Sequence, residues 1–79
     1  MSDTARHPST QHLLDLFEYE HLPEPLQAVS MPFSTLAHAL ADQLGDGVEM
    51  TVGLRKLLES KDAMVRHAVI QRRARGASE

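Results

Sequence analysis

Two stretches of helical apolar periodicity, joined by a short loop, constrain the fold of this chain more than any other feature. In the first stretch, apolar residues recur at spacings of three and four positions: Leu26, Val29, Phe33, Leu36, Leu40 and Leu44. The second stretch contains Leu54, Leu57, Leu58, Met64, Val65, Ala68 and Val69. Such spacing places apolar side chains on one face of a helix. Because the loop over residues 45–48 is short, we expect the two helices to pack antiparallel, as a helical hairpin.

Local signals mark the ends of the first of these helices and one irregularity within it. Pro25 suits the first turn of a helix, and Gly45 suits a left-handed C-cap. Pro32 lies inside the apolar stretch and cannot donate a backbone hydrogen bond to Ala28. We therefore expect either a kink near this proline or a break in the helix, with Ser30 capping the new start.

A shorter helix is expected at the N-terminal end, from about Ser9 to Tyr19. Ser9 or Thr10 can accept backbone N–H groups as its N-cap. Its eleven positions are too few for a helix that is stable by itself, so tertiary contacts must hold it. Its apolar face consists of Leu13, Leu16 and Phe17.

The predicted fold class is therefore all-α: a short N-terminal helix plus an antiparallel two-helix hairpin, in a single domain over residues 1–79. The last helix is expected to begin at about Glu49 or Thr51 and to end at about Arg73. We expect an ordered core over about residues 9–72 and flexible termini, because the tail after residue 72 lacks large apolar residues.

The length of the chain favours self-association. A chain of 79 residues buries only roughly 60% of the surface that its unfolded form exposes. A monomer of this size is marginally stable, and small domains of this kind often gain stability by oligomerising. We therefore expect the hairpins to assemble into a compact homo-oligomer.

Composition argues against several classes of function. There is no cysteine, which excludes disulfides and thiolate metal sites. The histidines lack metal-ligand spacing, and no nucleophile or phosphate-loop motif is present, so we expect no metal, no cofactor and no catalysis. No apolar run approaches the ~20 residues of a membrane helix, and residues 1–8 lack a signal-peptide core. These features predict a cytoplasmic protein with no membrane partner.

Charge is divided unequally along the chain. Residues 1–50 carry one basic and eight acidic side chains, a net charge of −7, whereas residues 51–79 carry seven basic and three acidic side chains, a net charge of +4; together they give the overall −3. The acidic part discourages binding of DNA or RNA. The basic part can meet a compact anion, or it is simply a solvated helix.

Three basic residues of the last helix are candidates for binding an anion. Lys61 falls on or beside the apolar stripe, so it must snorkel to solvent, pair with an acid or face another subunit. Lys56 and Arg66 add positive charge, and the planar fork of arginine suits phosphate. The alternatives are a solvated face and, for Arg66, an ion pair with Asp62 four positions earlier.

Two further residues near helix ends are candidates. Tyr19, beside the Leu22-Pro23 turn, can stack on a base or hydrogen-bond to a phosphate, or it can close the small core. Thr51 lies near the start of the last helix, where unpaired N–H groups favour an anion. Its plainer alternative is an ordinary N-cap.

These residues resemble the pattern of a known family. The elements are Phe17-x-Tyr19-x-x-Leu22-Pro23, the apolar stretch from Leu26 to Leu44, and Thr51-x-x-Leu54-x-Lys56-Leu57-x-Glu59-x-Lys61 followed by Val65-Arg66. They look like the helical hairpin shared by phage anti-CBASS cyclic-nucleotide sponges and anti-Thoeris sponges, the latter with an added β domain. The resemblance covers about residues 11–70. Because a β domain does not fit, the chain resembles the short anti-CBASS type.

The resemblance implies a function. Proteins of this family bind cyclic dinucleotides and cyclic trinucleotides in separate pockets between the subunits of a hexamer. They hold these immune signals intact in the cytoplasm of the infected bacterial host, which blocks activation of the CBASS effector. By position, Tyr19 is expected to stack on a base, and Thr51, Lys56, Lys61 and Arg66 are expected to line the ligand pockets.

Three other functions remain open at this point. A helical module that docks on another protein would bind no small molecule. A nucleic-acid binder would use the basic tail Arg72–Glu79 and would show steep salt dependence. A hydrolase that cleaves the signal is the least favoured, because the sequence contains no catalytic set.

Overall fold

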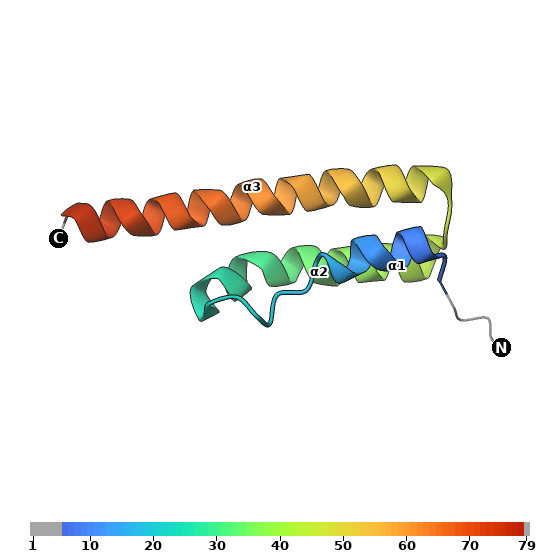
Figure 1. Cartoon of the computed structure of the whole chain (residues 1–79), viewed down its shortest axis with the longest axis horizontal. Helices are drawn as coiled ribbons and strands as arrows, with labels where there is room; N and C mark the ends of the chain where they lie inside the picture. The colour runs from blue at the N-terminus through green and yellow to red at the C-terminus, as the bar shows by residue number, and fades with distance from the viewer. Residues whose placement is uncertain (1–5, 79) are drawn as a thin grey trace.

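The computed structural model describes residues 6–78, which form three α-helices (Figure 1). They are α1 (Pro8–Asp15), α2 (Glu24–Leu44) and α3 (Val48–Ser78). Over these residues there is no strand, so the predicted all-α class is confirmed. α3 lies beside α2 and runs in the opposite direction, and α1 packs against both (Figure 1). The result is elongated, with extents of 55 × 21 × 17 Å.

α1 is shorter than expected and begins differently. It ends at Asp15 rather than near Tyr19, and it starts at Pro8, so the prediction of Ser9 or Thr10 as N-cap is wrong. The N-cap is His7, whose Nδ1 accepts a hydrogen bond from the backbone N–H of Ser9 at 3.1 Å. Proline suits the first helical position because its missing N–H would have no helical partner there.

α2 is a single helix that continues through Pro32. The expected alternative of a break at Ser30 is therefore wrong, and Ser30 is instead buried inside the helix. The carbonyl of Ala28 has no helical donor, because Pro32 lacks an N–H. Ala28 is exposed to solvent, so the missing hydrogen bond lies on the side of the helix that is open to water. Gly45 is the C-cap of α2, as expected, and its N–H bonds to the carbonyl of Ala41 at 2.9 Å. Its φ of 77° and ψ of −171° lie outside the expected left-handed α region, in an extended conformation that is essentially confined to glycine.

α3 is longer than expected. It begins at Val48 and continues to Ser78, five residues beyond the predicted end at Arg73. Ala74, Arg75 and Ala77 in the extension are good helix formers whether or not they are buried, whereas Gly76 is not. Of the termini that we expected to be flexible, residues 72–78 are helical, whereas residues 1–5 and 79 lie outside the described part of the chain.

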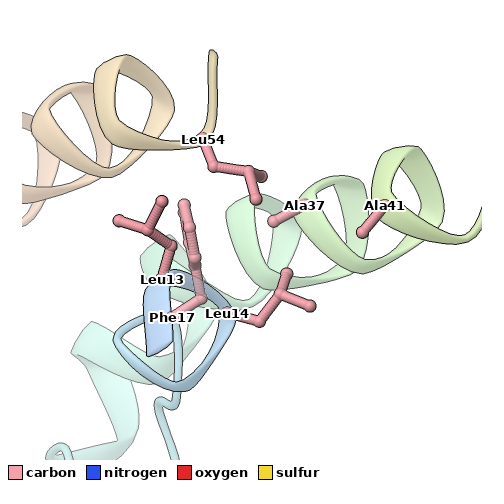
Figure 2. Packing of buried hydrophobic residues seen from close by; sticks show 6 residues of the cluster. All are labelled: Leu13, Leu14, Phe17, Ala37, Ala41 and Leu54. Atoms are coloured by element: carbon pink, nitrogen blue, oxygen red, sulfur yellow. The ribbon is translucent and has the colours of Figure 1, made fainter. Parts of the chain in front are cut away.

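The core lies where α1 crosses α2 and α3. It consists of Leu13, Leu14, Phe17, Ala37, Ala41 and Leu54. Phe17 has no exposed surface, and its ring points into the space between the three helices (Figure 2). The most buried face of α2 carries only small residues, namely Ser30, Ser34, Ala37 and Ala41. The leucine-rich face, which the periodicity marked as the apolar side of this helix, is only partly covered: Phe33 packs against the core, whereas Leu36 and Leu44 are exposed.

Substitution of Phe17 should show how far the core depends on one ring. Phe17→Ala leaves a large cavity and should lower the free energy of unfolding by about 3–5 kcal/mol. Ile70→Ala is the control, because Ile70 is 61% exposed, and its effect should stay within about 0.5 kcal/mol. Urea unfolding followed by circular dichroism measures both, and equal effects of the two variants would contradict this core.

Candidate functional site

A groove between α3 and the turn that follows α1 brings two of the predicted site residues together. The turn contributes Leu16, Glu18, His21 and Leu22, and α3 contributes Lys61, Asp62, Val65 and Arg66. On α3, residues 61 and 65 are one turn apart, as are residues 62 and 66, so all four lie along neighbouring edges of one helix. The groove encloses about 270 Å³.

The Lys61 side chain, only 12% exposed, binds the C-terminal end of α1. Its Nζ donates a hydrogen bond to the carbonyl oxygen of Leu16 at 3.3 Å and lies 3.1 Å from Oδ1 of Asp62. Leu16 is the C-cap residue of α1, where carbonyl groups lack helical partners and a positive charge is favourable. Of the predicted alternatives, Lys61 therefore pairs with an acid. An ammonium group has three donors, and these contacts use two of them.

Arg66 is exposed and carries an unneutralised charge. The predicted ion pair with Asp62 does not form, because Asp62 pairs with Lys61, its direct neighbour. Among the described residues, the guanidinium group of Arg66 has no hydrogen bond or ion pair. Its fork of N–H donors is therefore available to an anion that enters the groove.

Tyr19 lies in the turn but is not part of the groove lining. It is half-buried, and its carbonyl accepts a hydrogen bond from the N–H of Leu22 at 3.0 Å. The turn is also held by Gln27, whose Nε2 donates to the carbonyls of Glu20 at 3.3 Å and Leu22 at 2.8 Å. This contact was missed from the sequence, because nothing in the local pattern indicates which carbonyls an amide side chain will reach. The role of Tyr19 in binding stays a prediction.

Thr51 and Lys56 lie elsewhere on α3. Thr51 sits inside the helix rather than at its N-cap, and its hydroxyl donates to the carbonyl of Gly47 at 3.1 Å. Ten positions separate Thr51 from Lys61, which corresponds to about 15 Å along the helix. Lys56 is exposed. A single chain therefore brings Lys61 and Arg66 into one groove and leaves the other three predicted residues outside it.

The start of α3 already has a carboxylate beside it. Oδ2 of Asp46 accepts a hydrogen bond from the backbone N–H of His7 at 2.9 Å. This bond, followed by one with the side chain of Thr10, lowers the pKa of Asp46 below its usual value. Asp46 and Thr51 line the same hollow of about 420 Å³. Because the lining of this hollow contains a carboxylate and no Lys or Arg, it does not suit the predicted anion contact of Thr51 in one chain.

A larger groove, of about 650 Å³, is apolar and lies between α2 and α3 next to the loop. The charged residues that line it, Asp46 and Glu49, are acidic, so it does not suit a phosphate either. Over residues 6–78, no group of three or more His, Asp or Glu side chains is placed to hold a metal ion. In the same part of the chain, no helix combines the length and apolar character needed to cross a membrane.

Comparisons with known proteins identify no relative of this chain. No protein-family model matches the chain, no curated protein is similar to it, and no solved structure resembles it.

The link between Asp46 and the start of α1 should make stability depend on pH. Because the pKa of Asp46 is lower in the folded state than in the unfolded state, its contribution is present above pH ~4 and is lost as the pH falls through the lowered value. Asp46→Asn should reduce the urea midpoint at pH 7 and flatten its decline between about pH 5 and pH 2.

Glu59→Gln is the matched control for this prediction, since Glu59 is an exposed acid of α3 with no ion pair among the described residues. Its pH profile of stability should follow that of the unsubstituted chain. An Asp46→Asn profile that also follows the unsubstituted chain at every pH would contradict the assigned role of Asp46.

Proposed function

We propose that this chain binds cyclic dinucleotides and cyclic trinucleotides and holds them intact, as its resemblance to the anti-CBASS sponges implies. The observation that carries the proposal is the groove in which Lys61 and the unneutralised Arg66 lie together beneath the turn that holds Tyr19. The groove also contains the carboxylates of Glu18 and Asp62. Because Asp62 is engaged by Lys61, the base left for a phosphodiester is Arg66, whose charge-assisted hydrogen bonds offset the cost of removing the ligand's charge from water.

The proposed pocket needs a second copy of the chain. A groove of about 270 Å³ is smaller than the roughly 300–1,000 Å³ of typical ligand sites. In a homo-oligomer, a hexamer by the same resemblance, a neighbouring hairpin would close the groove. Residues such as Tyr19, Thr51 and Lys56, which one chain leaves apart, would then contribute to pockets between subunits.

The proposed mechanism is sequestration without chemistry. The fork of Arg66 takes one phosphate through two hydrogen bonds, and the third donor of the Lys61 ammonium group is shared with the ligand. The ring of Tyr19 stacks on a base. No bond of the ligand is broken and no cofactor is required, so each pocket removes one signal molecule from the cytoplasm of the infected host. CBASS effectors are then deprived of their activator.

Substitution of Arg66 tests this proposal. Arg66→Gln should weaken binding of cyclic GMP–AMP and cyclic tri-AMP by about tenfold to a hundredfold, because a hydrogen bond to a charged group is worth about 1.5–3 kcal/mol. Arg55→Gln removes the same charge from an exposed position of the same helix and should leave affinity nearly unchanged. Calorimetric titration measures both.

The fate of the ligand is the second part of this test. Heating the complex and chromatographing the released nucleotide should return it chemically unchanged. Recovery of a cleaved product would show an enzyme instead of a sponge. Equal affinity of the two arginine variants would remove Arg66 from the site.

A second candidate function is a helical interaction module that binds no small molecule. The observation that favours it is the apolar groove between α2 and α3, which is larger than the basic groove. This alternative predicts that no cyclic nucleotide produces heat in titration or raises the melting temperature of the folded protein.

A further inference from the structure

The groove between α3 and the turn that follows α1 is balanced in charge when its histidine is neutral. Its lining contains two basic side chains, Lys61 and Arg66, and two acidic ones, Glu18 and Asp62, so these four charges sum to zero. His21 lines the same groove. Because positive charge draws a phosphodiester to a site, the protonation of His21 decides whether the groove has a positive net charge for such a ligand.

His21 is placed so that its ring can take up a proton and bind an anion. It lies in the turn and is exposed to solvent, and its ring forms no hydrogen bond or ion pair with another residue of the described part of the chain. Histidine is the side chain that ordinarily changes its charge between about pH 5 and pH 8. A protonated imidazole has two N–H donors and no acceptor, which suits the oxygen atoms of a phosphate.

The groups around His21 leave this role open to it. The charged residues that line the groove with it are Glu18, Lys61, Asp62 and Arg66. Lys61 and Asp62 already pair with each other at 3.1 Å, and Gln27, through which α2 holds the turn, carries no charge. Glu18 and Arg66 therefore remain, one acid and one base. A phosphodiester bound beside the ring adds negative charge there and favours the protonated form of the histidine.

We infer that His21 is a further ligand-binding residue of this groove, and that its protonated ring binds the same phosphodiester as Arg66. The inference rests on the proposed function, because it adds a residue to the same pocket. His21 comes from the turn and Arg66 from α3, so an anion that enters the groove lies between the two. Binding is then coupled to the uptake of a proton and strengthens as the pH falls.

Calorimetric titration with cyclic GMP–AMP at about pH 8 and about pH 5.5 tests this role, because histidine changes its charge between them. Wild-type affinity should be about threefold to tenfold higher at the lower pH. His21→Gln should bind like wild type at the higher pH and gain nothing at the lower one. His67→Gln is the matched control, since His67 is exposed and lies next to Arg66 but outside the groove lining; it should keep the gain.

Effects of pH on the fold act in the opposite direction. His7 caps α1 through an Nδ1 that accepts a hydrogen bond, and protonation removes this acceptor. A loosened α1 would disturb the groove and lower affinity as the pH falls. The link through Asp46 is kept at the lower pH of the test, because its contribution is lost only below pH ~4. Circular dichroism should show every variant folded at both pH values.

Proton uptake gives a second readout. Heats of binding measured at about pH 6.5 in two buffers of different ionisation enthalpy report the protons taken up per ligand. Wild type should take up a fraction of a proton, and His21→Gln should take up none. Glu18→Gln removes a negative charge from the groove, so it should tighten binding at both pH values and keep the uptake. If the uptake disappears in Glu18→Gln, the protonated ring pairs with Glu18 rather than with the ligand, and the inference is wrong.

The outcomes separate this inference from the proposed function. Binding of intact nucleotide with equal affinity at both pH values would overturn the role of His21 and leave the proposed function standing. So would a His21→Gln variant that retains the gain at the lower pH. A protein that binds no cyclic nucleotide at either pH would contradict the proposed function and, with it, the role of His21.

Discussion

The packing of α1 across one side of the α2–α3 pair is the interaction on which the rest of this structure depends. An isolated helix of eight residues is unstable in water, so α1 exists only because other parts of the chain hold it. Phe17 and its neighbours anchor it in the core (Figure 2). Asp46 binds the backbone just before its first residue, and Lys61 binds the carbonyl of its C-cap residue. Both ends of α1 are thus fixed by side chains from distant segments.

This arrangement gives the two sides of the α2–α3 pair different characters. On the side of α1, the turn after that helix forms a small groove with α3, and Lys61 serves both as the anchor of α1 and as part of the groove. Because Asp62 is engaged with Lys61, it does not neutralise the charge of Arg66. On the other side, leucines and methionines have no cover within the chain.

The helices themselves could be predicted from the sequence, because apolar spacing and the Gly45 cap are local signals. Contacts between distant segments could not be predicted from the sequence. No local rule shows that His7 rather than Ser9 caps α1, or that Asp62 turns to Lys61 rather than Arg66, because each choice depends on where α1 docks. The sequence showed which face of α2 is the most apolar. The buried positions are nevertheless taken by the small residues Ala37 and Ala41, because small side chains let α1 and α3 approach closely. Of the five predicted site residues, only Lys61 and Arg66 meet in one chain.

We propose that this chain holds an intact cyclic nucleotide in a pocket that more than one copy of the chain completes. Native mass spectrometry of the protein with cyclic tri-AMP tests it most directly, because one spectrum reports the number of chains, the number of ligands and the mass of each ligand. The expected spectrum shows an oligomer that carries unmodified nucleotide, with no nucleotide on single chains. Ligand bound to single chains, ligand of altered mass, or an oligomer that takes up no cyclic nucleotide would contradict it.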